Sequence, residues 1–162
     1  MQDILKEVDV LFEERFKKKK INYSKTLPPN LPSVFVDFHQ IQQVFINLYL
    51  NSLDAMKKGG EIIISARTVQ KVIYPRDRRK KAFVSQKKES LYVEVKVTDT
   101  GMGISPENKK VIFDPFFTTK PQGTGLGLSI VYRIMEEHQG EIRVESELDK
   151  GTSFFLLLPT EE

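Results

Sequence analysis

The sequence contains no cysteine, and its only histidines are His39 and His138. Without cysteine there is no disulfide, thiolate zinc site or cysteine nucleophile, so the fold must rest on packing. No apolar run approaches the roughly 18 residues that cross a bilayer, and the first residues lack the charged and then apolar pattern of a signal peptide. We therefore expect a cytoplasmic domain without membrane contact of its own, in a parent protein that could be anchored upstream.

Positive charge is concentrated in one segment. The formal charge is +3 and the pI about 9.0. Between Lys71 and Lys88, however, eight lysines and arginines stand against one aspartate, which gives this segment +7 and leaves the rest mildly acidic. A single charged loop usually marks a solvated connection rather than a site for an acidic partner. We therefore interpret residues 70–90 as a basic, mobile insert and expect no nucleic-acid binding.

The length of 162 residues, 40% of them hydrophobic, suffices for one domain with a core. Helical spacing of apolar residues predicts helices over 3–17, 37–59, 105–113 and 124–138. Runs rich in β-branched residues predict strands over 61–69, 91–99, 141–147 and 152–158, with short extended runs at 21–24 and 34–36. This order favours an α/β (α+β) two-layer sandwich, with a mixed, mostly antiparallel sheet and helices packed on one face.

Two glycine clusters lie about 25 residues apart. Asp99 to Gly103 follows a strand-like run, and Gly123 to Leu128 opens a helix-like run. Glycine lets a ligand approach the backbone, and free N–H groups at a helix start attract phosphate oxygens. Neither cluster is a Walker loop or the dinucleotide fingerprint. Together they predict a nucleotide pocket of another kind.

A polar stripe lies on the second predicted helix, where Asn47, Asn51 and Asp54 fall within an arc of about 60° beside the apolar face. Mg²⁺ prefers hard oxygen ligands and usually keeps waters and phosphate oxygens. An asparagine amide oxygen that faces a triphosphate is therefore a sensible metal ligand. Taken alone, the stripe is also explained by a solvated helix edge.

Five motifs occur in order along the chain. They are Asn47-Leu-Tyr-Leu-Asn51-Ser-Leu-Asp54-Ala55, Asp99-x-Gly101-x-Gly103, Phe113-Asp-Pro-Phe116-Phe117, Gly123-Thr-Gly-Leu-Gly-Leu128 and Gly151-Thr152-Ser153-Phe154. From about Ile21 to Leu158, the chain resembles the catalytic and ATP-binding domain of sensor histidine kinases, whose N, G1, F, G2 and final glycine boxes have this order. The resemblance implies the Bergerat-type ATP-binding fold shared with DNA gyrase, the mismatch-repair ATPases and the large heat-shock chaperone.

The resemblance also implies residue roles. Asn51 would be the Mg²⁺ ligand, Asn47 its neighbour at the phosphates, and Asp99 the acceptor for the adenine amino group, which suits an acceptor-only carboxylate. Lys120 would join Asn47 and Asn51 as the catalytic set by adding charge near the γ-phosphate, and a surface lysine on the lid is the alternative. The lid would comprise residues 114–123, with Phe116 and Phe117 in it and Phe113 in the core. The residues expected to bind ATP, or ADP as product, with Mg²⁺ are Asn47, Asn51, Asp54, Asp99, Gly101, Gly103, Phe117, Thr118, Thr119, Lys120, Gly123, Thr124, Gly125, Leu126, Gly127, Leu128 and Thr152.

The residue at position 47 bears on the reaction. Hydrolysing relatives carry a water-activating glutamate there, whereas the amide of Asn47 cannot act as a general base near neutral pH, which favours phosphoryl transfer. Family acceptor histidines precede an acidic residue on a separate helical hairpin, and neither His39 nor His138 has this context. We expect His39 on the surface and His138 as a complement to a helix dipole. The implied partners are a dimerisation and phosphoacceptor domain absent from this chain and, through it, a response regulator. The isolated chain should be a monomer.

Two other functions remain open at this point. One is a protein serine kinase of the same superfamily, such as an anti-sigma factor or a dehydrogenase kinase, whose phosphoserine would survive acid. The other is a nucleotide-gated binding module whose basic loop contacts nucleic acid, with binding that weakens steeply with salt.

Overall fold

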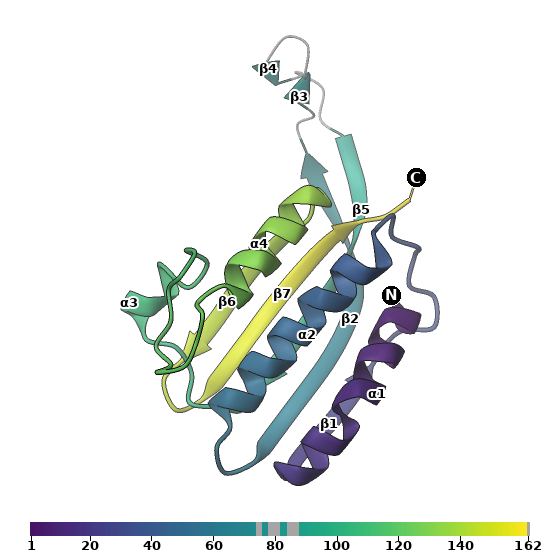
Figure 1. Cartoon of the computed structure of the whole chain (residues 1–162). Helices are drawn as coiled ribbons and strands as arrows, with labels where there is room; N and C mark the ends of the chain where they lie inside the picture. The colour runs from purple at the N-terminus through teal and green to yellow at the C-terminus, as the bar shows by residue number, and fades with distance from the viewer. Residues whose placement is uncertain (74–75, 78–81, 84–87, 162) are drawn as a thin grey trace.

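The computed structural model describes residues 1–73, 76–77, 82–83 and 88–161. A five-stranded sheet with strand order β1-β2-β5-β7-β6 forms one layer, and α1, α2 and α4 cover one of its faces (Figure 1). β1 pairs in parallel with β2, and the other neighbours in this sheet pair antiparallel. The predicted two-layer sandwich is confirmed. The elements are α1 (Gln2–Lys18), β1 (Ile21–Thr26), α2 (Phe38–Ala55), β2 (Gly60–Ile73), β3 (Arg76–Asp77), β4 (Ala82–Phe83), β5 (Lys88–Asp99), α3 (Pro106–Lys109), α4 (Gly127–Glu137), β6 (Glu141–Glu147) and β7 (Gly151–Pro159).

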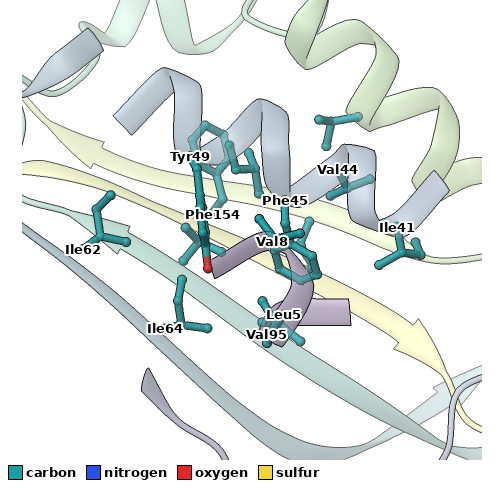
Figure 2. Packing of buried hydrophobic residues seen from close by; sticks show 14 of the residues in the cluster. Leu5, Val8, Ile41, Val44, Phe45, Tyr49, Ile62, Ile64, Val95 and Phe154 are labelled. Atoms are coloured by element: carbon teal, nitrogen blue, oxygen red, sulfur yellow. The ribbon is translucent and has the colours of Figure 1, made fainter. Parts of the chain in front are cut away.

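Helix α2 begins where its capping residue predicts. Asp37 accepts a hydrogen bond from the Gln40 N–H at 2.9 Å, which satisfies a donor of the first turn. The helix ends at Ala55 rather than at the predicted Gly59-Gly60, because Gly60 already pairs with Ile21 as the first residue of β2. Figure 2 shows the apolar side of α2 above the sheet. The residues labelled there on α2 and on the sheet are Ile41, Val44, Phe45, Tyr49, Ile62, Ile64, Val95 and Phe154.

Two further helices are shorter than predicted. α3 is capped by Ser105, whose Oγ accepts the Asn108 N–H at 3.2 Å, but it ends at Lys109 and the chain continues in turns toward Pro115. α4 begins at Gly127 rather than Thr124, because Gly125 has φ +69°, outside the right-handed helix.

Strands β2 and β5 extend as a ribbon past the helices (Figure 1). Their pairing continues to Ile73 and Lys88, beyond the predicted 61–69 and 91–99. Residues 74–75, 78–81 and 84–87 of the basic insert lie outside the described part of the chain, so its mobility stays a prediction. Lys88 is eleven residues from Asp99 along β5, a separation of about 36 Å in an extended strand. The described base of the insert is therefore remote from Asp99.

None of the described helices covers the second face of the sheet, and charged side chains line it. Glu94 is 5% exposed and accepts hydrogen bonds from Arg67 Nε at 2.7 Å and from Arg143 at 3.1 Å. The ring of Phe155 lies between Lys96 and Arg143, each 5.2 Å from its centroid. Within the described residues, no helix is both long and apolar enough to span a bilayer.

His138 joins the end of α4 to the start of α2. Its Nδ1 is 2.8 Å from the Ile134 carbonyl, and its Nε2 accepts the Asp37 N–H at 2.9 Å. The Nδ1 contact is with a carbonyl of the last turn of α4, the helix end at which the sequence predicts a complement to the dipole. The bond of the second nitrogen to a backbone donor far away in sequence was not predicted.

Replacing His138 by alanine should lower the free energy of unfolding by about 0.5 to 1.5 kcal/mol, the net value of a neutral hydrogen bond. Urea denaturation measures this change. His39→Ala is the matched control, because His39 is exposed on the first turn of α2 and should change stability by less than about 0.5 kcal/mol. Equal effects of the two substitutions would contradict the role of His138.

Deleting Val72 to Gln86 and joining the strands by a short turn should change the free energy of unfolding little, since loop-closure entropy varies slowly with loop length. ADP affinity should also stay unchanged, because the base of the insert is remote from Asp99. Denaturation and calorimetry on the deletion variant check the two expectations. An ADP affinity lost with the insert would show that it reaches the pocket.

Candidate nucleotide site

One end of the site is a buried carboxylate. Asp99, the last residue of β5, is 4% exposed and accepts hydrogen bonds from the Ser52 hydroxyl and the Gly101 N–H, both at 2.9 Å. Burial raises the pKa of Asp99, and the hydrogen bonds from Gly101, Ser52 and Thr152 offset part of this rise. A carboxylate has about four acceptor sites, so these three donors still leave capacity to receive an amino group.

The surroundings of Asp99 explain Gly101 and Thr152. A Cβ on Gly101 would lie 2.6 Å from the Ala55 Cβ at the end of α2, so only glycine fits there. Thr152 pairs with Asp99 across β5 and β7, and its hydroxyl lies 2.9 Å from that of Ser146. Beside them is a hollow of about 330 Å³. It is lined by Thr98, Asp99, Glu145, Ser146, Glu147, Lys150, Gly151, Thr152 and Ser153.

Sequence reasoning missed two residues at this end. Ser52 donates a hydrogen bond to one oxygen of Asp99. A polar serine on the buried side of α2 was the sequence feature that could have identified it. Ser146 contacts Thr152 and accepts the Ile104 N–H at 2.8 Å. The position of Ser146 opposite Thr152 in the predicted hairpin could have identified it from the sequence.

The other end of the site lies at the start of α4. The first N–H groups of α4 have no partner within the helix, as in any helix, and the N-cap residue Leu126 provides no side-chain cap for them. Asn47 faces this helix start, since its Oδ1 is 3.7 Å from the Cβ position of Gly127. In the described part of the chain, Asn47 Nδ2 is buried without a hydrogen-bond partner. Unpaired donors from a helix start and a buried amide suit an anion.

Lys120 contacts the polar stripe of α2. Its Nζ lies 3.0 Å from Asn51 Oδ1 and 2.7 Å from Asp54 Oδ2. The Lys120 N–H donates to the Thr118 hydroxyl at 3.1 Å, and the Gly123 N–H donates to the Lys120 carbonyl at 3.1 Å. The structure thus brings together predicted residues from α2 and from segment 114–123.

Segment 114–123 is anchored by backbone contacts. The Phe116 N–H donates to the Gly125 carbonyl at 2.9 Å, and a Cβ on Gly125 would lie 2.3 Å from the Phe116 carbonyl carbon. Phe116 itself has φ +67° and a side chain that is 76% exposed. A bulky residue in this conformation is strained. Phe113 instead packs against the core, as predicted, with its ring 5.6 Å from that of Tyr132.

The remaining predicted residues lie around these two ends. Phe117 and Leu128 pack against the hydrophobic core, and Thr119 is exposed. Thr124 accepts the Leu126 N–H at 3.4 Å. Gly103 has φ +71°, and a Cβ there would lie 2.1 Å from the Glu147 carbonyl oxygen, so packing alone already requires a glycine.

The family model for histidine kinase-, DNA gyrase B-, and HSP90-like ATPases matches residues 36–162. The chain belongs to this family. Sporulation kinase E of Bacillus subtilis is 35% identical over 82% of this chain and 15% of its own length. The sensor kinase CckA of Brucella abortus is 41% identical over 86% of this chain and 14% of its own length. The sensor histidine kinase ZraS of Escherichia coli is 36% identical over 87% of this chain and 26% of its own length. The chain thus spans about a quarter or less of these relatives.

Solved structures agree with this assignment. The catalytic domain of histidine kinase ThkA has a TM-score of 0.76 and 34% identity, covering 99% of this chain and 92% of that one. Full-length ShkA in complex with AMPPNP has a TM-score of 0.77 and 25% identity, covering 99% of this chain and 30% of that one. The chain is thus of the ATPase domain type of sensor histidine kinases, and the family supports ATP as its nucleotide.

Asp99→Asn should weaken ADP binding by about 1 to 3 kcal/mol, because a charge-assisted acceptor is lost. Without nucleotide, the free energy of unfolding should stay equal or rise, because the amide keeps an acceptor oxygen and no buried charge remains. Calorimetry and thermal unfolding measure the two quantities. Equal ADP affinity of both proteins would refute the assignment.

The effect of Asp99 on stability should depend on pH. Its pKa is raised in the folded protein, so ionisation of Asp99 costs stability as the pH rises through that pKa. The stability difference between wild type and Asp99→Asn should therefore shrink as the pH falls toward 3.8, the ordinary value, where the carboxyl is protonated. A difference that does not change over this range would contradict the raised pKa.

Proposed function

We propose that this domain binds ATP with Mg²⁺ and transfers the γ-phosphate to a histidine on a separate helical dimerisation domain. The main support is Asn47, whose Oδ1 lies 3.7 Å from the Cβ position of Gly127 at the uncapped start of α4 and whose buried Nδ2 has no hydrogen-bond partner among the described residues. These donors would receive phosphate oxygens, while Asp99 would accept the adenine amino group. Segment 114–123 would act as the lid, with the expected set from Phe117 to Leu128 around the phosphates.

The residues on the edge of α2 fit a metal ion. Asn51 Oδ1 and Asp54 Oδ2 are hard oxygen atoms that already contact a cation, the amine of Lys120. Asn51 would hold Mg²⁺ together with phosphate oxygens. When bound, the metal would neutralise charge on the phosphates.

Transfer to another domain agrees with the places of the two histidines. His39 is twelve residues before Asn51 on α2, about 18 Å along the helix axis. Both ring nitrogens of His138 lie in hydrogen bonds at the far end of α4. The domain would therefore contribute positioning and charge neutralisation to a nucleophile supplied from outside.

The partners are proposed on the same basis. ThkA, 31% identical to this chain, has been solved in complex with the response regulator protein TrrA. We expect a comparable regulator to receive the phosphate by way of the acceptor domain, in the cytoplasm where ATP is available. The isolated domain should be a monomer.

Asn51→Ala should reduce mainly the Mg²⁺-dependent part of ADP binding, because it removes the proposed metal ligand and leaves Asp99 in place. Calorimetry with Mg²⁺ and with EDTA separates the two parts.

Radiolabelled ATP should leave the domain unlabelled and should label an added acceptor domain of its own protein, but only weakly, because the covalent link that raises effective concentration is missing.

The control for transfer is the same acceptor domain with its histidine replaced. Label on this control, or label that survives acid as phosphoserine does, would contradict transfer to histidine. Label on the catalytic domain itself, unaffected by the acceptor, would overturn the proposal.

A further inference from the structure

The amine of Lys120 occupies an oxygen that the proposed function assigns to the metal. Lys120 Nζ lies 3.0 Å from Asn51 Oδ1, within hydrogen-bond distance, and 2.7 Å from Asp54 Oδ2. A magnesium ligand lies about 2.1 Å from the ion. An ion at that distance and an amine at 3.0 Å would compete for the same side of the amide oxygen.

The contact is held from both sides. The backbone of Lys120 is fixed in a turn by Thr118 and Gly123, so its side chain starts from a defined place. Asp54 lies almost one helical turn after Asn51 and supplies the opposite charge. A single amine therefore joins segment 114–123 to α2.

The contact is also weak enough to exchange. The side chains of Lys120 and Asp54 are 42% and 51% exposed. Exposed ion pairs of this kind change an equilibrium constant by about fivefold at most. The doubly charged Mg²⁺ attracts the amide oxygen more strongly than one ammonium group does.

We propose that Lys120 is an exchangeable cation at the metal position and that Asp54 is its positioning residue. The amine and Mg²⁺ alternate at Asn51 Oδ1, and Asp54 keeps the displaced amine near the phosphates. The lid and the metal position are thereby coupled through one side chain. This inference rests on the proposed function, which assigns Asn51 to the metal.

The decisive variant is Lys120→Met, tested with ADP, which has no γ-phosphate. If the amine competes with the metal, the dissociation constant of ADP with Mg²⁺ should fall about two- to fivefold. The constant in EDTA should not rise. The control Lys110→Met removes another exposed lysine ten residues earlier and should change neither constant. A comparable catalytic domain has been crystallised by itself, which supports measurements on this chain.

The role of Asp54 requires a double-mutant cycle. Asp54→Asn should change the dissociation constant of ADP with Mg²⁺ by factors that differ at least twofold between the wild-type and Lys120→Met backgrounds. If Asp54→Asn changes this dissociation constant by the same factor in both backgrounds, the carboxylate does not act through the amine.

A readout without ligand uses the lack of cysteine. A fluorophore on Gln122→Cys gives a single label on the exposed end of segment 114–123. Both Asp54→Asn and Lys120→Met should lower its anisotropy, and Lys110→Met should not. Unchanged anisotropy in both variants would contradict the anchoring contact.

The outcomes separate the two proposals. Mg²⁺-dependent ADP binding that Lys120→Met leaves unchanged would overturn the exchange and leave the proposed function standing. A poorer affinity in EDTA without a better one in Mg²⁺ would assign the amine to the phosphates alone, which also overturns the exchange. Absence of Mg²⁺-dependent binding in the wild type would overturn both.

Discussion

The rotation of α2 about its own axis determines where the site lies. Its apolar side is buried on the sheet between α1 and α4, and Tyr49 on that side donates to Asp9 of α1 at 3.0 Å. With this side fixed, Asn47 faces the start of α4 and Asn51 faces Lys120. A change of one residue in helix register would turn these side chains by about 100°. The packing of a hydrophobic helix thus sets the positions of polar groups that do not themselves stabilise the core.

The sequence predicted the features that depend on local pattern. The cap at Asp37, the apolar face of α2 and the glycines all follow from spacing along one segment. The bond from Ser52 to Asp99 joins residues 47 apart, and the bond from Asp37 to His138 joins residues 101 apart. No periodicity encodes such pairs. The start of α4 was missed for a different reason, since it depends on a backbone angle at Gly125 that is fixed by contact with Phe116.

Several residues of the site are arranged at a cost to the folded protein. Asp99 is a carboxylate in a buried position, Asn47 has a buried donor without a partner in the described chain, and Phe116 adopts a positive φ. Each would be avoided if stability alone were selected. Among the described residues, the hydrophobic core that α1, α2 and the sheet share does not include these three side chains.

The second face of the sheet, which carries Glu94, Lys96 and Arg143, affects how readily the domain associates with other copies of itself. An uncovered sheet that exposed Phe155 alone would adhere to other sheets or to itself. Here Lys96 and Arg143 lie over that ring, and Glu94 holds Arg67 and Arg143 in place, so charged groups rather than the bare ring face the solvent. Because charged groups cover the ring, this face of the sheet disfavours self-association of the domain.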